Sequence, residues 1–501
     1  MANSQARLTK PTLDKDLDKL TRVEEAAHFV SKGLVAPGIG LVFLALAMVF
    51  SAVYVMDRPG AVIIIAAAAI GAYMAMNIGA NDVTNNVSPA VGSKALTMTG
   101  ALVIAAIFET LGAVIAGGDV VSTISKGIID PTSVPGTNAF IWAMMAALLA
   151  SALWLNLATW LGAPVSTTHS IVGGVMGAGI AAAGADAVDW VQMSSIAASW
   201  IISPLLGGIV AAIFLAFIKE YIIYRDDKLA AARKWVPVLI AVMTGAFAAY
   251  LATKGLNRLI SISFVTALLI GIAAGVISYF AAVPFVGRQS LGLENRYQSL
   301  RKLFRIPLIF SAALLSFAHG ANDVANAIGP LAAIVHAAQD AEVSSNVTVP
   351  FWVMLIGAVG ISLGLLLFGP RLIALVGEQI TKLNPMRAFC VALSAALTVI
   401  VASAMGLPVS STHIAVGAVF GVGFFREWYT RNSKRRLEYI RRKGGKIDLE
   451  EAEERNPDEM RRRYLVRRSH FMTIVAAWII TVPAAAGLSA LLFVLLDSVF
   501  G

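Results

Sequence analysis

Long apolar stretches recur from one end of this sequence to the other, and they restrict the fold more than any other feature. A run of about 18 or more apolar residues is long enough to cross a ~30 Å hydrocarbon core as a helix. Only 14% of the residues are charged, whereas soluble domains carry about a quarter. The alternating pattern of a membrane β-barrel is absent from these stretches. The sequence therefore predicts an all-α polytopic membrane protein.

About 12–13 transmembrane helices are expected from the positions of the apolar stretches. The candidate spans are residues 35–56, 61–91, 98–117, 139–162, 165–183, 194–218, 236–253, 260–282, 306–337, 351–377, 386–406, 409–425 and 471–497.

Lysine and arginine fill alternate connections between these spans. They gather in residues 1–33, 219–234, 284–305 and 426–470, whereas 185–193 and 338–350 contain none. The positive-inside rule then places the N-terminus and the 426–470 loop in the cytoplasm. The net charge of +9 is thus a topology signal, and no nucleic-acid partner is expected, although the 426–470 loop could contact anionic lipids. The single cysteine, Cys390, excludes an internal disulfide.

A Gly-Ala-Asn-Asp-Val motif occurs twice, at 79–83 and 320–324. On the predicted topology, 61–91 runs inward and 306–337 runs outward, so the two copies enter the membrane from opposite sides. A second pair follows each copy: GAPVSTTHSIVGGVMGAG at 162–179 and GLPVSSTHIAVGAVFGVG at 406–423. Two motifs in the same order predict two inverted-topology repeats, an arrangement in which secondary transporters use discontinuous helices. We expect broken or re-entrant helices at the glycines and prolines of these motifs, which are Gly79, Gly320, Pro89, Pro330, Pro164 and Pro408.

The predicted organisation has seven parts. A cytoplasmic segment at 1–33 precedes an extra anchor helix at 34–57, and the first transport repeat covers 58–218. Connecting helices and basic loops occupy 219–305, and the second repeat covers 306–425. A charged cytoplasmic loop at 426–470 leads to a final transmembrane helix at 471–501.

Each Asp motif places a carboxylate and amides at membrane depth. A bare charge there costs several kcal/mol, so Asp82 and Asp323 are expected to mark an ion or proton pathway. Asparagine oxygens beside a carboxylate suit a hard cation such as sodium; these asparagines are Asn81, Asn85, Asn322 and Asn326. The alternative is that each aspartate only caps an interrupted helix.

The second motif predicts an anion site. Three hydroxyl residues follow each proline and begin an apolar helix, whose N-terminus offers free N–H groups and a positive dipole end. They are Ser166, Thr167, Thr168, Ser410, Ser411 and Thr412. The alternative is an ordinary helix cap with spare hydroxyls. His169 and His413 follow the hydroxyls, and helix packing or gating is the default role for both.

At these residues the sequence resembles the inorganic phosphate transporter (PiT) family, from about residue 61 to the end. The resemblance implies a symporter with two inverted repeats that carries phosphate with sodium or protons. It implies phosphate contacts from Asn81, Asn322, Ser166, Thr167, Thr168, Ser410, Ser411 and Thr412. It implies cation contacts from Asn81, Asp82, Asn85, Asn322, Asp323, Asn326 and Glu109, with sodium as a candidate ion at Asp82 and Asp323.

The second repeat departs from the family pattern at one position. Members often place a glutamate in the helix after each Asp motif. Glu109 fills this position in the first repeat, whereas the second repeat offers only Gly360, Ile361 and Ser362. A second acidic cation ligand is therefore not expected there.

The predicted function is import of inorganic phosphate by symport with sodium or a proton, through alternating access. We expect no enzyme activity and no cofactor beyond the coupling ion. The location predicted is the plasma membrane, specifically a bacterial inner membrane, and a homodimer is compatible with the resemblance. A sulfate symporter on the same scaffold is the nearest alternative, and an anion channel is a more distant one.

Overall fold

The structure is a computed structural model that describes residues 34–118, 120–255, 260–340, 348–379, 383–442 and 468–500. Within these ranges the regular structure is helical, apart from one isolated bridge between Ile129 and Val188. Eleven helices in the described ranges are long and apolar enough to cross a membrane. The predicted all-α polytopic membrane fold is confirmed.

The helix Leu34–Val55 comes first among the described residues. It is followed by α2 (Ala61–Asn81), α3 (Val83–Gly92), α4 (Met98–Ala116), α5 (Val121–Lys126), α6 (Thr137–Leu161), α7 (Thr167–Ala183), α8 (Trp190–Ile218), α9 (Lys228–Lys254), α10 (Phe264–Gln289), α11 (Tyr297–Leu303), α12 (Arg305–Asp323), α13 (Ala325–Asp340), α14 (Phe351–Gln379), α15 (Pro385–Ala404), α16 (Ser411–Asn432), α17 (Lys434–Arg442) and α19 (Arg468–Phe500). Short 3-10 turns lie at Pro131–Ser133 and Ala185–Ala187, and a π-helical turn at Lys219–Ile223.

All thirteen expected spans correspond to helices, but α7 and α16 are not among the eleven long apolar ones. Helix α7 has only 17 residues, fewer than the ~20 that a full crossing needs. Helix α16 begins with Ser411, Thr412 and His413 and extends to Asn432. Residues 1–33 and most of the 426–470 loop lie outside the described residues, although α17 within that loop is helical.

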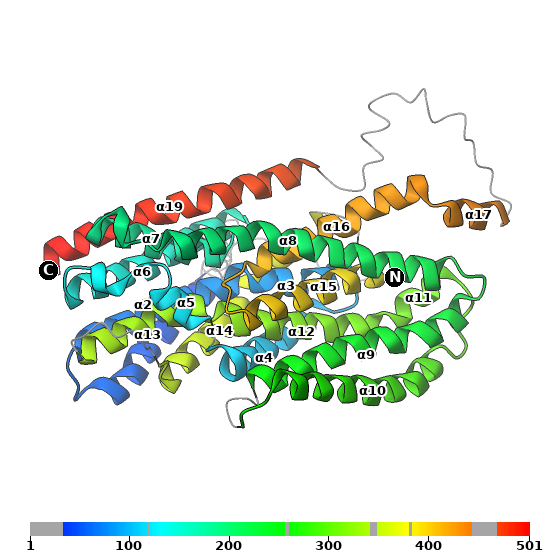
Figure 1. The fold of residues 1–501 in the computed structure, drawn as a ribbon, viewed down its shortest axis with the longest axis horizontal. Helices are drawn as coiled ribbons and strands as arrows, with labels where there is room; N and C mark the ends of the chain where they lie inside the picture. Colours follow the sequence, from blue (N-terminus) through cyan, green and yellow to red (C-terminus); the bar gives the residue numbers. More distant parts are fainter. Residues whose placement is uncertain are drawn as a thin grey trace, which may run out of the picture.

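The two Asp-motif helices run in opposite directions. Figure 1 shows α2 leading rightward into α3, and α12 leading leftward into α13. The helices that carry the hydroxyl motifs lie apart in the same view, with α7 toward the left and α16 toward the right. Helix α2 packs on α14, and α12 packs on α4. The long helix that follows each Asp motif, α4 or α14, therefore packs against the Asp-motif helix of the other half of the chain.

Two groups of helices form around the hydroxyl motifs. The first group is α6, α7 and α19, and the second group is α8, α15 and α16; within each group the three helices pack on one another. The buried apolar residues also divide into two clusters. One includes Leu148 of α6 and Val172 of α7, and the other includes Leu215 of α8 and Val416 of α16.

The predicted helix breaks are present at only one of the two motif types. Residues 163–166 and 407–410 are non-helical and lead directly into α7 and α16, as expected. Gly79 and Gly320, in contrast, lie within α2 and α12, and Pro89 and Pro330 lie within α3 and α13, so the breaks predicted at these residues are wrong. Asp82 keeps right-handed helical angles (φ −76°, ψ −43°) between α2 and α3. These glycines allow close helix contact instead. A Cβ on Gly79 would lie 1.8 Å from the Ile361 carbonyl oxygen, and one on Gly320 2.3 Å from that of Glu109.

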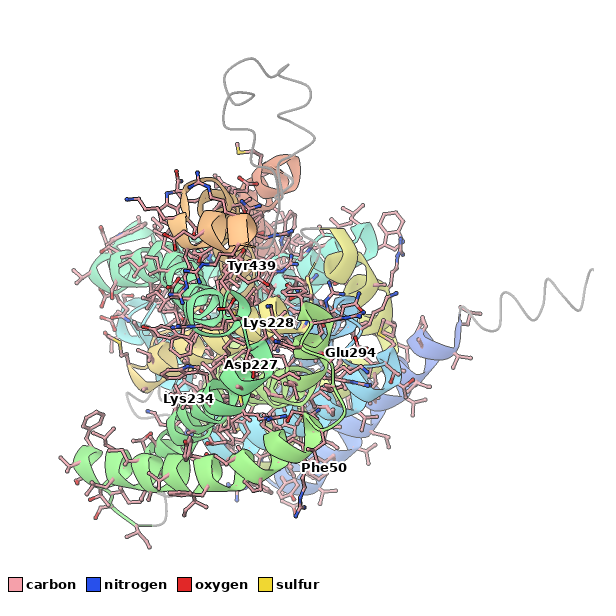
Figure 2. All side chains as sticks on the ribbon, turned by 90° about the vertical axis from the view of Figure 1, so that its right-hand side faces the viewer. Phe50, Asp227, Lys228, Lys234, Glu294 and Tyr439 are labelled. Carbon is pink, nitrogen blue, oxygen red and sulfur yellow. The ribbon has the colours of Figure 1, made fainter. Side chains whose placement is uncertain are left out.

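One end of the molecule is rich in charged side chains. Figure 2 views this end and labels Asp227, Lys228, Lys234 and Tyr439 near it. Lys228 donates to the Tyr439 hydroxyl at 2.8 Å and to the Arg225 carbonyl at 3.1 Å. This is the end that the positive-inside rule assigns to the cytoplasm.

Candidate functional site

Asp82 and Asp323 lie together in the interior, although 241 positions separate them in the sequence. Both are fully buried. One ligand atom from each of Asp82, His319 and Asp323 lies within 4.8 Å of the others. Asp82 is at the junction of α2 and α3, and Asp323 ends α12. The opposed Asp motifs therefore converge on one point.

Hydroxyls from both α7 and α16 donate to Asp82. Thr167 donates its hydroxyl to Asp82 Oδ2 at 2.6 Å and its backbone N–H to the same oxygen at 3.2 Å. Thr412 donates its hydroxyl to Asp82 Oδ1 at 2.7 Å. The N-terminus of α7, which the sequence marks as an anion site, thus already contacts the carboxyl group of Asp82.

Asp323 has weaker hydroxyl contacts and a histidine. Thr167 and Ser411 each place a hydroxyl 3.3 Å from Asp323 Oδ2. His319 Nε2 lies 3.1 Å from the same oxygen. Asp323 Oδ1 accepts no hydrogen bond from the described residues. One oxygen of this carboxylate therefore remains available to a ligand.

His319 connects Asp323 to Glu109. Its Nδ1 lies 2.8 Å from Glu109 Oε2, and both side chains are fully buried. Asn86 donates to the other Glu109 oxygen at 2.9 Å. The result is a continuous polar chain that runs from α3 and α4 to α12. Glu109, expected as a cation ligand, is thus joined to the site through His319 and is not in direct contact with either aspartate in the described contacts.

Asn85 and Asn326 extend toward the hydroxyls of the opposite half. Asn85 donates its amide to Thr412 Oγ1 at 2.9 Å, and Asn326 donates to Thr167 and Thr168, each at 3.2 Å. The Asn85 carbonyl oxygen is buried and accepts no hydrogen bond from the described residues. Together with Asp323 Oδ1, it provides the kind of oxygen that a hard cation prefers.

Asn81 and Asn322 hold the non-helical segments in place. Asn81 donates to Thr159 Oγ1 at 2.9 Å and to the Ala163 carbonyl at 3.1 Å, and its own Oδ1 accepts from Val165 N at 3.1 Å. Asn322 donates to Ser403 Oγ at 2.9 Å and to the Leu407 carbonyl at 3.3 Å. In this conformation both amides bind protein groups. Their expected contacts with phosphate and cation stay predictions.

The hydroxyl residues divide by role. Ser166 and Ser410 are the N-caps of α7 and α16, because each accepts the backbone N–H of the histidine three residues later, at 3.1 and 3.2 Å. Thr168 donates to the Val409 carbonyl at 3.0 Å. Only Thr167, Ser411 and Thr412 reach the carboxylates. The cap alternative therefore holds for the first serine of each motif, and the phosphate role of the others stays a prediction.

Sequence reasoning missed His319, Asn86, Thr159 and Ser403. His319 had a local signal, since it is a histidine directly before the second Asp motif, inside an apolar stretch where the first copy has Ile78. Its partner Glu109 lies 210 positions away, so the pairing depends on the packing of α12 against α4. Thr159 and Ser403 gave no signal, because hydroxyl residues are common within membrane helices.

This chain is similar to known proteins over most of its length. Residues 78–489 match the model of the phosphate transporter family. A Helicobacter pylori protein named "Putative phosphate permease" is 46% identical, over 96% of this chain and 98% of that protein. A Haemophilus influenzae protein of the same name is 34% identical, over 86% of this chain and 96% of that protein.

A solved structure is also similar. It is described as "The sodium-dependent phosphate transporter", is 34% identical and superposes with a TM-score of 0.76, covering 88% of this chain and all of that one. The match to the family model includes both Asp motifs and both hydroxyl motifs, because these lie within residues 78–489. The chain belongs to the phosphate transporter family.

Proposed function

We propose that this protein imports inorganic phosphate by symport with a cation, through alternating access, and acts as a carrier and not as an enzyme. One observation carries the proposal: the Thr167 and Thr412 hydroxyls donate to the Asp82 carboxylate at 2.6 and 2.7 Å. Donors that suit a bound anion are engaged by a carboxylate of the protein itself. Phosphate must compete with Asp82 for them.

The charge balance supports a cation requirement. Asp82, Asp323 and Glu109 are three buried carboxylates, and His319 is the one basic side chain among their described contacts. If all four are ionised, the net charge is −2. Two like charges at 4 Å repel by about 4 kcal/mol at an effective dielectric of ~20. A phosphate that enters without a cation therefore meets strong repulsion, and two bound monovalent cations would cancel the net charge of −2.

The oxygens available to a cation favour sodium. Asp323 Oδ1 and Asn85 Oδ1 are buried and accept no hydrogen bond from described residues, and carboxylate and amide oxygens are ligands for hard cations. The similar solved structure carries the words sodium-dependent in its description. A proton on one of the buried carboxylates is the alternative coupling ion, since it would remove the same negative charge.

The opposed helices support alternating access. The α2–α3 and α12–α13 pairs run in opposite directions in Figure 1, and both Asp motifs converge on one site. A central site between inverted repeats can open to either side by movement of one repeat against the other. A channel would need no such exchange, so we place the anion channel below the carrier. We further propose a bacterial inner membrane as the location; the homodimer stays a prediction.

Phosphate is favoured over sulfate by hydrogen-bond chemistry. Protonated phosphate can donate as well as accept, whereas sulfate only accepts. The acceptor that we expect it to use is the side-chain oxygen of Asn322, because Asn81 Oδ1 already accepts from Val165 N and the printed contacts of Asn322 use its amide nitrogen. A sulfate symporter on the same scaffold is the competing function.

Uptake into proteoliposomes tests the proposal. Labelled phosphate and labelled sulfate are offered at equal concentrations, with sodium and proton gradients imposed separately. We expect phosphate uptake that a sodium gradient drives, and acceleration of that uptake by unlabelled phosphate inside the vesicles. Sulfate uptake that exceeds phosphate uptake would contradict the substrate, and uptake without such acceleration would indicate a channel.

A further inference from the structure

Four aromatic rings form a row beside the candidate site: Trp200, His169, His413 and Trp478. The ring centroids of Trp200 and His169 are 3.8 Å apart, and those of His413 and Trp478 are 3.7 Å apart. The two imidazoles meet edge to face, with centroids 4.3 Å apart and planes at 90°. We call these four rings the ring clasp.

Every contact in the ring clasp crosses between the two helix groups. His169 of α7 and Trp478 of α19 belong to the first group, and His413 of α16 and Trp200 of α8 belong to the second. The His169 ring therefore packs against the other group's tryptophan with the planes tilted by 40°, and the His413 ring does the same at 30°. The clasp joins the two bodies that carry the hydroxyl motifs.

The clasp buries polar atoms that have no partner. His169 and His413 are 5% and 1% exposed. All four of their ring nitrogens, and Trp478 Nε1, lack a well-formed hydrogen bond among the described residues, although the Trp478 backbone lies near the His169 ring. A neutral imidazole always carries one N–H donor, and an unsatisfied buried donor is costly. Ring packing stabilises the contact between the two helix groups, whereas burial of the unpaired nitrogens destabilises it. The balance of these two terms favours a contact that can form and break.

The clasp is directly linked to the two hydroxyl motifs. The backbone N–H of His169 donates to Ser166 Oγ, and that of His413 donates to Ser410 Oγ. The first turn between each cap and histidine contains the residues that bond to Asp82 and Asp323. Separation of the two histidines would therefore move Thr167 away from Ser411 and Thr412.

We propose that the ring clasp is a separable joint that positions the two hydroxyl motifs around phosphate when closed and opens during each transport cycle. This rests on the proposed function of phosphate transport. His169 and His413 are positioning residues in this account, and the polar nitrogens serve to keep the closed state from becoming too stable. A phenylalanine ring would stack without that opposing cost.

The test compares phenylalanine with alanine at the same positions. His169→Phe and His413→Phe should lower the maximal rate of phosphate uptake about tenfold while phosphate binding is retained or tightened, since removal of one unsatisfied buried donor shifts the populations by roughly that factor. His413→Ala should do the opposite: the half-saturating phosphate concentration should rise about fivefold or more, with the maximal rate maintained. Thermal unfolding of each purified variant reports whether it is folded.

His336→Phe is the matched control, because His336 contacts Asp340 and the Thr348 carbonyl, outside the clasp and the site. Phenylalanine variants with wild-type rate and affinity would overturn the proposal, as would a joint loss of rate and affinity in the folded alanine variant. If the phenylalanine variants do not fold, the alanine result alone decides. Wild-type protein is measured in the same vesicles: no phosphate uptake there would overturn the proposed function, whereas normal uptake with unaltered variants would overturn only the clasp.

Discussion

The two Asp motifs have the same sequence but different surroundings. His319 lies 3.1 Å from Asp323 and 2.8 Å from Glu109, so the three side chains form a buried polar chain. In the first motif, Ile78 occupies the position of His319, since each directly precedes the motif glycine. Ile361 occupies the position of Glu109, because Gly79 approaches the Ile361 carbonyl as Gly320 approaches that of Glu109. Both isoleucines are fully buried.

The two copies of the motif therefore share one sequence but stabilise their aspartates through different contacts. Asp82 is held by three hydrogen bonds from Thr167 and Thr412. Asp323 has only two hydroxyl contacts of 3.3 Å and depends on His319. We infer that Asp323 is the carboxylate that contacts a transported cation, because its Oδ1 accepts no hydrogen bond from the described residues whereas both oxygens of Asp82 do.

The largest expected effect is on stability, from His319→Ile. This change leaves Glu109 and Asp323 as buried carboxylates without a basic partner, and breaking a buried pair in this way costs about 3–5 kcal/mol. Adding Glu109→Ile recreates the apolar pair of the first motif and should recover part of the loss. Equilibrium unfolding in detergent measures both. The matched control is Ile361→Val, for which we expect a loss of about 0.5–1.5 kcal/mol in the free energy of unfolding. A loss below ~1 kcal/mol for His319→Ile would show that the protein does not depend on the contacts of His319 with Glu109 and Asp323 for its stability.

The same comparison shows what could be predicted from the sequence. Helix positions followed from apolar length, and the repeated motifs singled out Asp82 and Asp323 as candidate site residues. The Glu109–His319 contact could not be predicted, because it depends on how α4 packs against α12. The uninterrupted course of α2 through Gly79 was also missed, since a glycine that breaks a helix and one that admits a neighbouring carbonyl look the same in a sequence.

The second prediction concerns phosphate affinity. Thr167→Val and Ser411→Ala each remove a hydroxyl donor, and a hydrogen bond to a charged group contributes about 1.5–3 kcal/mol, or roughly a 10- to 150-fold change in affinity. Thr167 should have the larger effect, because its hydroxyl reaches both carboxylates and Ser411 reaches only Asp323, at 3.3 Å. Calorimetric phosphate titration measures this, with exposed Ser194→Ala as the control. Unchanged affinity in both variants would mean that these hydroxyls only cap or brace the helices.

The smallest effect should be the same in both halves. Ser166 and Ser410 cap their helices at 3.1 and 3.2 Å, so Ser166→Ala and Ser410→Ala should each lower the free energy of unfolding by about 1 kcal/mol. Thermal and chemical unfolding of the two variants side by side provide the measurement. A clear difference between the two losses of unfolding free energy would show that the N-termini of α7 and α16, like the two Asp motifs, have different roles.

The most direct test of the account measures phosphate affinity against sodium concentration and against pH, in the wild type and in Asp82→Asn and Asp323→Asn. The account holds that the carboxylates repel phosphate and occupy its donors until a cation binds, so cation and phosphate should raise each other's affinity by the same factor. Both variants should lose this cation dependence more severely than they lose residual phosphate binding, and Asp323→Asn should lose more of it, since Asp323 Oδ1 is the carboxylate oxygen that accepts no hydrogen bond from the described residues. If both variants keep the wild-type cation dependence, the aspartates do not couple the two ligands, and their role is to hold the helix ends together.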